Sequence, residues 1–265
     1  MTERPSVALI GAGNLAWHLG PALDNAGYPV VSVCSAHIEN AVALQQHLYS
    51  AEVAEGLDFS GSPAVLFIIC VGDDMIEDVA RELVLPEGVL VAHTSGSRHI
   101  DVLRYTAADD TGVLYPLQTF SKDRKIDFGQ VPFLIEASSE NADGVLYEIA
   151  RSLSAQVYRA DSAQRELIHL AAVLASNFSN HLITLAGKLL REHDITPDLL
   201  YPLIAETANK AMELGPEAAQ TGPARRGDFG VIDRHLHLLG NSGYSEVYAL
   251  MSRLIREYYH DGIRD

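Results

Sequence analysis

The sequence predicts an α/β chain in which a mainly parallel sheet, with helices on both faces, is followed by an all-helical domain. Residues 7–16 pass from an apolar run into a GxGxxA turn and then into helix-forming sequence, which is typical of a Rossmann-type dinucleotide-binding crossover. Short apolar runs then alternate with amphipathic segments to about residue 160, and from Ser162 onward the pattern is helical. We therefore expect a dinucleotide-binding domain over 1–160 and a helical substrate or dimerisation domain over 161–265.

The alternation also predicts the order of the elements. Apolar, β-type runs predict strands at 7–10, 30–34, 64–71, 89–93, 113–115, 133–135 and 156–158. Segments with apolar residues at helical spacing predict helices at 15–26, 40–49, 75–83 and 142–153, and one long helix from about 164 to 192.

Composition excludes several classes of protein. The formal charge of −16 argues against a nucleic-acid partner, which would need clustered Lys and Arg. Cys34 and Cys70 lie at the ends of expected strands without metal or CxxC spacing, so we expect reduced core residues in a cytoplasmic protein. Residues 1–6 are too short and polar for a signal peptide, and no apolar stretch is long enough to span a membrane.

The glycine turn predicts the cofactor-binding residues. Gly11 permits the tight turn, Gly13 lets the backbone approach a pyrophosphate, and Ala16 packs where the helix meets the strand. The N–H groups of Asn14 and Leu15 are expected to face the phosphates.

The end of the second expected strand predicts which dinucleotide binds. NAD-binding domains place a carboxylate there for the ribose hydroxyls, whereas this chain has Ser35, with His37 close by. A carboxylate would repel a 2′-phosphate and Ser35 can donate a hydrogen bond, so NADP is favoured and NAD remains possible. Alternatively, Ser35 merely ends the strand.

Two further strand ends are expected to line the cofactor cleft. Val71 and Gly72 end one strand, and the residue after them, Asp73, is expected to cap a helix. His93 ends another strand and begins the sequence HTSGS, in which Thr94 and Ser95 could bind a substrate carboxylate or carbonyl. A plain polar turn is the alternative.

The long helix at 164–192 carries a polar stripe. The stripe comprises Arg165, His169, Ser176 and Asn180, with Asn177 and Thr184 beside it. At about 100° per residue these positions share one face of a helix that is otherwise apolar on nearly all sides. Such a helix is expected to be buried, so cofactor, substrate or protein groups must satisfy the stripe. A core histidine is the alternative for His169.

Two loops remain open to interpretation. The segment 115–121 offers Gln118, Thr119 and Ser121 as substrate contacts, or is a structural crossover. In the segment 221–228, Arg225 or Arg226 could clamp a carboxylate or phosphate, or Asp228 could pair with one of them. No metal site is expected, because His235 and His237 point in different directions on a helix.

These segments carry a resemblance to a known family. GAGNLA at 11–16, VGDDMI at 71–76, HTSGS at 93–97, YPLQTFS at 115–121, HLAAVLASNFSN at 169–180 and TGPARRGD at 221–228 resemble a bacterial family of putative NADP oxidoreductases with a Rossmann-like domain and a helical domain. More distantly, the chain is similar to pyrroline-5-carboxylate reductase, ketopantoate reductase and the β-hydroxyacid dehydrogenases. The resemblance implies a homodimer formed through the helical domain.

The resemblance also implies a reaction. Hydroxyacid and ketopantoate enzymes use a Lys four residues before an Asn, and if Asn177 matches that Asn, the Lys position is Val173. His169 is then the expected acid–base group of an NADP-dependent oxidoreductase that transfers a hydride to or from a small carbonyl, hydroxyacid or imine.

The remaining site residues have expected roles in holding the substrate. Asn177 and Asn180 would orient it, Ser95, Thr94 and Ser176 would contact it, and Arg225 or Arg226 would hold its anionic end. Two alternatives are an NADP-binding sensor without turnover, and an interaction protein whose glycine turn is structural only.

Overall fold

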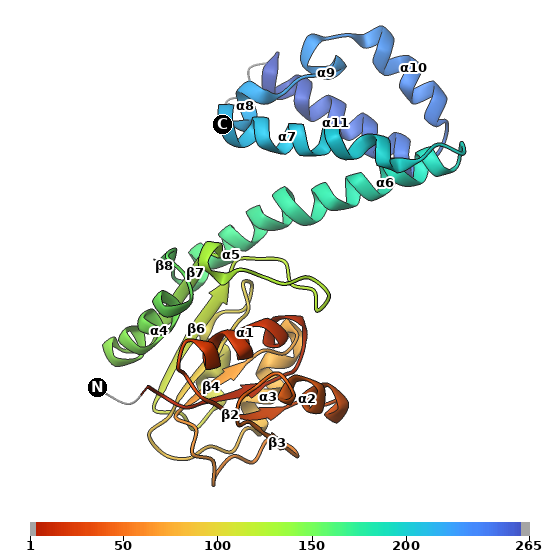
Figure 1. Ribbon diagram of the computed structural model, residues 1–265. Helices are drawn as coiled ribbons and strands as arrows, with labels where there is room; N and C mark the ends of the chain where they lie inside the picture. Colours follow the sequence, from red (N-terminus) through yellow and green to blue (C-terminus); the bar gives the residue numbers. More distant parts are fainter. Residues whose placement is uncertain (1–3, 261–265) are drawn as a thin grey trace. The chain divides into compact units, whose positions relative to one another are not determined.

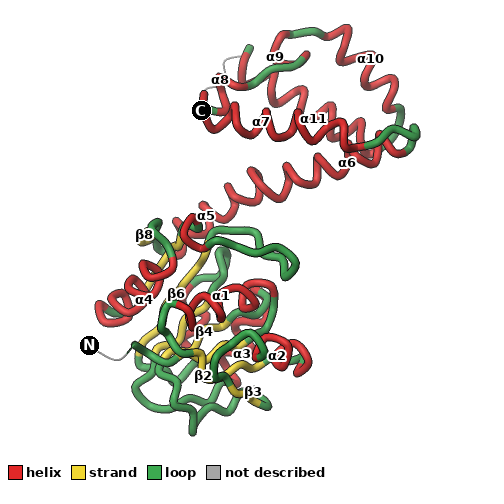
Figure 2. Tube along the Cα trace, viewed as in Figure 1, coloured by secondary structure: helices red, strands yellow, loops and turns green. Residues whose placement is uncertain are grey.

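The computed structural model describes residues 4–260 and divides the chain into two compact units (Figures 1 and 2). The first unit is Met1–Ala175 and the second is Ser176–Asp265. Figure 2 shows the strands, in yellow, gathered in the first unit, whereas the second unit is helical.

The first unit contains one eight-stranded sheet in the order β3-β2-β1-β4-β5-β6-β7-β8. The strands are β1 (Val7–Ile10), β2 (Val30–Cys34), β3 (Glu52–Ala54), β4 (Leu66–Ile69), β5 (Leu90–His93), β6 (Asp110–Pro116), β7 (Phe133–Ala137) and β8 (Val157–Arg159). Only the β6–β7 pair is antiparallel. The expected mainly parallel sheet is therefore confirmed, and its first six strands have the Rossmann order.

Helices cover both faces of this sheet because alternate strand residues point to opposite sides. Leu9 of β1 belongs to the core cluster shared with α1 (Asn14–Asn25), α2 (Ile38–Gln45) and α4 (Glu140–Leu153). Its neighbour Ile10 belongs to the opposite cluster, which is shared with α3 (Ile76–Glu82) and the 3₁₀ helix η2 (Ile100–Tyr105). Strands buried on both faces read as continuous apolar runs, which is why the sequence predicted them.

Two elements differ from the expectation. Strand β3 was not expected, because its three residues are partly exposed at the edge of the sheet and show no apolar run. Asp73 was expected to cap a helix, and that expectation is wrong. Gly72 occupies the cap of the 3₁₀ helix η1 (Asp73–Met75) without a side-chain bond, and the Asp73 carboxylate accepts a hydrogen bond from Ser97 Oγ at 2.6 Å instead.

The chain is helical from Ser162 to Arg191, with a change of geometry inside. An α-helix, α5 (Ser162–Ala172), is followed by a π-helical segment, Val173–Phe178, and then by α6 (Ser179–Arg191). A π turn takes more residues than an α turn, so the polar stripe expected from regular helical spacing is not continuous across it.

The expected burial of this helix is wrong for the single chain. The exposed fractions of Leu167, Leu170, Leu174 and Phe178 are 67%, 55%, 56% and 55%. Ser176, Asn177 and Asn180 are exposed as well.

The rest of the second unit consists of short and medium helices. They are the 3₁₀ helix η5 (Pro197–Leu200), α7 (Tyr201–Leu214), α8 (Pro216–Ala219), α9 (Pro223–Arg226), α10 (Phe229–Leu239) and α11 (Gly243–Tyr259). Between residues 176 and 260 there is no strand, as the sequence predicted. No helix within residues 4–260 is long and apolar enough to cross a membrane.

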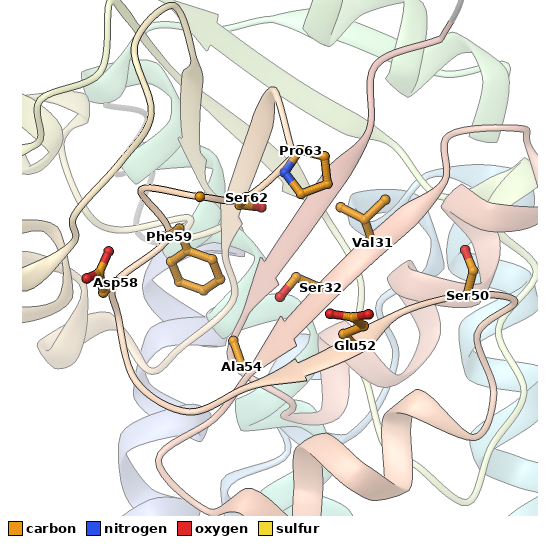
Figure 3. A pocket seen from close by; sticks show the side chains of 10 residues that line it. Val31, Ser32, Ser50, Glu52, Ala54, Asp58, Phe59, Ser62 and Pro63 are labelled. Carbon is orange, nitrogen blue, oxygen red and sulfur yellow. The ribbon is translucent and has the colours of Figure 1, made fainter.

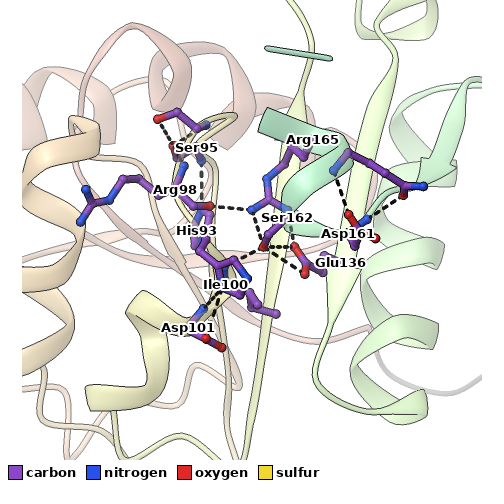
Figure 4. Close-up of polar contacts among 12 residues, drawn as sticks. His93, Ser95, Arg98, Ile100, Asp101, Glu136, Asp161, Ser162 and Arg165 are labelled. Carbon is purple, nitrogen blue, oxygen red and sulfur yellow. Dashed lines mark hydrogen bonds and ion pairs between the residues drawn. The ribbon is translucent and has the colours of Figure 1, made fainter. Parts of the chain in front are cut away.

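Arg165 of the expected stripe is a buried structural residue (Figure 4). Its side chain is 1% exposed and forms an ion pair with Glu136 of β7. The guanidinium also donates to the Arg98 carbonyl at 2.6 Å and to Ser162 Oγ at 3.2 Å. Ser162 Oγ in turn donates to Glu136 and accepts from the Ile100 N–H at 3.0 Å. This network ties the start of α5 to the sheet and to the segment after β5.

His93, which was expected to contact the cofactor, is fully buried at the end of β5. Its Nδ1 accepts from the Ser95 N–H at 3.1 Å, while Nε2 has no hydrogen-bond partner among the described residues. Burial, with a smaller contribution from the Arg165 charge, lowers the pKa of His93 to about 3. The ring is therefore neutral at physiological pH.

Replacing Arg165 with alanine should strongly destabilise the first unit. The substitution leaves the Glu136 carboxylate without its cationic partner, and breaking a buried ion pair in this way costs about 3–5 kcal/mol. Arg159→Ala is the matched control, because Arg159 pairs with Asp143 but is 59% exposed, and an exposed pair contributes little to stability. Urea unfolding followed by the fluorescence of the single tryptophan, Trp17, measures both. Equal losses would contradict the structural role of Arg165.

His93 should make the first unit less stable in acid. Its pKa is about 3 in the folded chain and about 6.5 when unfolded, so between these values only the unfolded chain binds the proton. Stability contributed by the neutral ring is complete above about pH 6.5 and falls as the pH drops toward 3, by at most about 1.4 kcal/mol per pH unit. Urea unfolding at about pH 7 and about pH 5 should show a shallower pH dependence for His93→Asn. His99→Asn, a change at an exposed histidine, should keep the wild-type slope.

Candidate active site

A cavity of about 740 Å³ lies at the carboxyl ends of β1, β2 and β4. Ligands of doubly wound sheets bind at this edge, where the strand order reverses between β1 and β4. Six of the expected cofactor residues line it: Gly11, Gly13, Asn14, Ser35, Val71 and Gly72. Leu15 lies in the first turn of α1, half-buried against the core, and His93 lies in the sheet.

The glycine turn has the geometry that a pyrophosphate site needs. Gly11 has φ +109°, and a Cβ there would lie 2.6 Å from the Cys70 carbonyl oxygen, so only glycine fits. Gly13 precedes α1 and provides no side-chain cap. The first N–H groups of α1 therefore meet the cavity without a competing side chain, which suits an anionic group.

The end of β2 presents hydroxyl and amide groups to the cavity. Ser35 Oγ accepts from the His37 N–H at 3.3 Å, which leaves its hydroxyl hydrogen free to donate. Asn40 and Lys122 line the cavity beside them. The carboxylates in the cavity wall, Asp78 and Glu82, come from α3 instead. Sequence reasoning missed Lys122, because it is 87 positions from Ser35 along the chain and no local motif marks it.

The hydroxyl groups of HTSGS are engaged within the protein. Thr94 Oγ1 donates to the Ile69 carbonyl at 3.1 Å. Ser95 Oγ accepts from the N–H groups of Ser97 and Arg98 at 3.1 and 3.0 Å, and the residue is 4% exposed. These contacts have the form of a polar turn.

His169 and Tyr115 form a pair near this turn. The Tyr115 hydroxyl and His169 Nδ1 are 3.0 Å apart, and both side chains are half-buried. Tyr115 comes from the end of β6 and His169 from α5. Burial raises the pKa of Tyr115, and the nearby Asp73 charge raises it further, so the phenol keeps its proton at neutral pH. Tyr115 lies in the segment 115–121 that the sequence singled out, but its contact with His169 was not predicted.

Gly96 makes room for this pair. A Cβ at residue 96 would lie 2.6 Å from His169 Nδ1 and 2.7 Å from Tyr115 Cζ. The glycine of HTSGS therefore lets the turn pack against the two side chains. The bond from Ser97 to Asp73 joins the same turn to the strand end that lines the cavity.

The other expected substrate residues belong to the second unit. Arg225 stacks over the Tyr259 ring, with 4.2 Å between its guanidinium carbon and the ring centroid, and Arg226 is exposed. Asp228 accepts from the Val231 N–H and caps α10, and it forms no ion pair with either arginine among residues 4–260. The roles proposed for Ser176, Asn177, Asn180 and the arginines remain predictions.

A second cavity, of about 570 Å³, lies beside β2 and β3 (Figure 3). Val31 and Ser32 of early β2 line it, together with Ser62 and Pro63 before β4. It therefore lies toward the amino ends of the strands, away from the edge where such sheets bind nucleotides. The part of the chain that the structure describes contains no cluster of three His, Cys, Asp or Glu that could hold a metal ion.

Comparison with known proteins places the chain in a family. Residues 1–118 match a Rossmann-like domain, and residues 131–255 match a domain of unknown function, DUF2520. No curated protein sequence matches the chain.

Solved structures extend this comparison over both units. A putative NADP oxidoreductase from Bacteroides fragilis is 41% identical, with 96% of this chain and 99% of that chain covered and a TM-score of 0.86. An NADPH complex of a reductive aminase from Aspergillus terreus, 16% identical, covers 98% and 95% with a TM-score of 0.71. An imine reductase from Pseudomonas, 18% identical, covers 96% and 94% with a TM-score of 0.65. The two less identical structures show the shared fold. The chain belongs to the family of the putative NADP oxidoreductase from Bacteroides fragilis, joining a Rossmann-like domain to a DUF2520 domain.

Proposed function

We propose that this protein is an NADP-dependent oxidoreductase acting on a small carbonyl, hydroxyacid or imine. The observation that carries the proposal is the Tyr115–His169 pair, which lies at the same edge of the sheet as the dinucleotide cavity. The 41% identity to the putative NADP oxidoreductase from Bacteroides fragilis supports it.

The residues of the cavity fit a dinucleotide. The N–H groups of Asn14 and Leu15, after the turn at Gly11 and Gly13, would hold the pyrophosphate, and Ser35 would contact the adenine-bearing ribose. Val71 and Gly72 line the same cavity and would contact the cofactor between its pyrophosphate and nicotinamide. When bound, NADPH supplies the hydride.

His169 serves as the acid–base group, and Tyr115 positions it. In the imidazolium form both ring nitrogens carry protons. Nδ1–H donates to the Tyr115 oxygen, and Nε2–H is transferred to the alkoxide or amine anion that forms on the substrate. The neutral ring then keeps its remaining proton on Nδ1, bonded to Tyr115. In the oxidative direction the Nε2 lone pair accepts the proton of the alcohol or amine.

The substrate contacts in this proposal come from sequence patterns. Asn177 and Asn180 orient the substrate with Ser176, and Arg225 or Arg226 holds its anionic end. The Thr94 and Ser95 hydroxyls are already bonded to the backbone, so we assign them to holding the turn that packs against His169.

Removing His169 should abolish most turnover but leave NADPH binding intact. His169→Asn is expected to lower kcat by about a hundredfold or more, as loss of a general acid does. Tyr115→Phe should cause a smaller loss and shift the pH dependence of kcat, because Nδ1 loses its fixed partner. NADPH oxidation across a panel of keto acids, hydroxyketones and imines measures both. Exposed His193 provides the control His193→Asn.

Two outcomes would contradict parts of this assignment. Unchanged turnover in His169→Asn would exclude His169 as the acid–base group. If NADPH raises the melting temperature but is not oxidised with any substrate of the panel, the alternative of an NADP-binding sensor without turnover is favoured instead.

We also propose that the chain forms a homodimer through its helical region. Leu167, Leu170, Leu174 and Phe178 are each more than half exposed along one continuous helical segment. Exposed apolar surface of this extent is typical of an interface.

Light scattering should therefore give about twice the chain mass of 28.8 kDa. Leu170→Glu together with Leu174→Glu should shift the mass toward the monomer, because each change would bury a charge in the interface. Tyr49→Glu changes an apolar residue of the first unit that is 76% exposed and should leave the mass unchanged. A monomeric wild-type protein would overturn the proposal.

A further inference from the structure

We propose that Lys122 recognises the 2′-phosphate of NADP(H) and sets the preference over NAD(H). This inference rests on the proposed function, since it names a residue of the cofactor cavity. It assigns the discrimination to a segment after β6 rather than to the β2 end alone.

Lys122 lies where the adenine-bearing ribose is expected. The Lys122 side chain lines the cavity together with Ser35, His37 and Asn40, which form the end of β2 and the start of α2. Lys122 Nζ donates to Asn40 Oδ1 at 3.3 Å. In Rossmann domains the group at the end of the second strand contacts the ribose 2′-position.

The ammonium group is held in place within the protein itself. It lies over the Trp17 ring, with 4.9 Å between Nζ and the ring centroid, and the side chain is half-buried. The neighbouring Ser121 carbonyl is bonded to His18 Nε2 at 2.8 Å, and the ring centroids of Phe120 and Phe128 are 6.0 Å apart. A preorganised cation loses less conformational entropy when an anion binds.

The charges around Lys122 favour a phosphate. Among the described residues that line the cavity, Lys122 is the one Lys or Arg, and it forms no ion pair with a carboxylate. The carboxylate that NAD-binding domains use for the ribose hydroxyls is replaced by Ser35, whose hydroxyl hydrogen is free to donate. Asp78 and Glu82 enter the wall from α3, which packs on the opposite face of the sheet from α1 and α2. A dianionic 2′-phosphate bound here would meet the Lys122 ammonium group and two neutral polar side chains, Ser35 and Asn40.

The test compares 2′,5′-ADP with 5′-AMP, which differ by the 2′-phosphate alone. In calorimetric titrations Lys122→Gln should weaken 2′,5′-ADP binding about tenfold to a hundredfold, the range for one charged hydrogen bond. Binding of 5′-AMP should change less than about twofold. Lys122→Arg should retain most of the affinity for 2′,5′-ADP. Lys125→Gln removes the same charge from an exposed residue of the same segment that does not line the cavity, and should have no effect.

Each other result has a defined meaning. Equal weakening of both nucleotides, or no weakening of 2′,5′-ADP, overturns the assignment of Lys122. A wild-type protein that binds neither nucleotide nor NADPH overturns both this inference and the proposed function. A wild-type protein that discriminates through Lys122 but oxidises no NADPH across the substrate panel supports the inference while the proposed reaction fails.

Discussion

The cavity depends on one close approach, between Gly11 and the carbonyl of Cys70. The two neighbouring strands β1 and β4 lie so near one another at their carboxyl ends that a Cβ at residue 11 would be 2.6 Å from the Cys70 oxygen. Gly11 also has φ +109°, which a side chain would disfavour. The absence of a side chain lets β1 turn directly into α1, so that the helix begins at the point where the strand order reverses. Because of this turn, the positive end of the α1 dipole and the free N–H groups of its first turn lie at the cavity.

The second constraint is the burial of Arg165, because the contacts that stabilise this side chain also position His169. Arg165 and His169 are four residues apart in α5, so they lie on the same face, one turn from each other. The ion pair with Glu136 and the bond to the Arg98 carbonyl hold the first turn of that helix against the sheet. His169 is thereby brought within 3.0 Å of Tyr115. Of the stripe expected to meet cofactor or substrate, Arg165 is thus a structural residue, whereas His169 is the residue to which we assign proton transfer.

The sequence was sufficient for the sheet because its central strands are buried on both faces. Their apolar runs, which alternate with segments of helical spacing, predicted the parallel architecture, and the GxGxxA motif predicted the glycine turn. Strand β3 escaped because a short edge strand needs no apolar pattern. The burial of the long helix was overestimated, because an apolar surface looks the same in sequence whether it packs within the chain or remains exposed. The π segment at Val173–Phe178 could not be found from a periodicity that assumes regular turns.

The pairing of residues across the sheet edge was beyond sequence reasoning for a different reason. Tyr115 and His169 are 54 positions apart, and Lys122 and Asn40 are 82 apart, so no spacing rule relates them. The net charge of −16 gave no sign of a cation placed for an anionic ligand. At physiological salt, exposed charges are largely screened beyond about 8 Å, so the distant carboxylates matter less than the groups that line the cavity. In the binding mode we propose, an acidic protein would hold a polyanionic dinucleotide through the backbone N–H groups of one glycine turn and a single preorganised lysine.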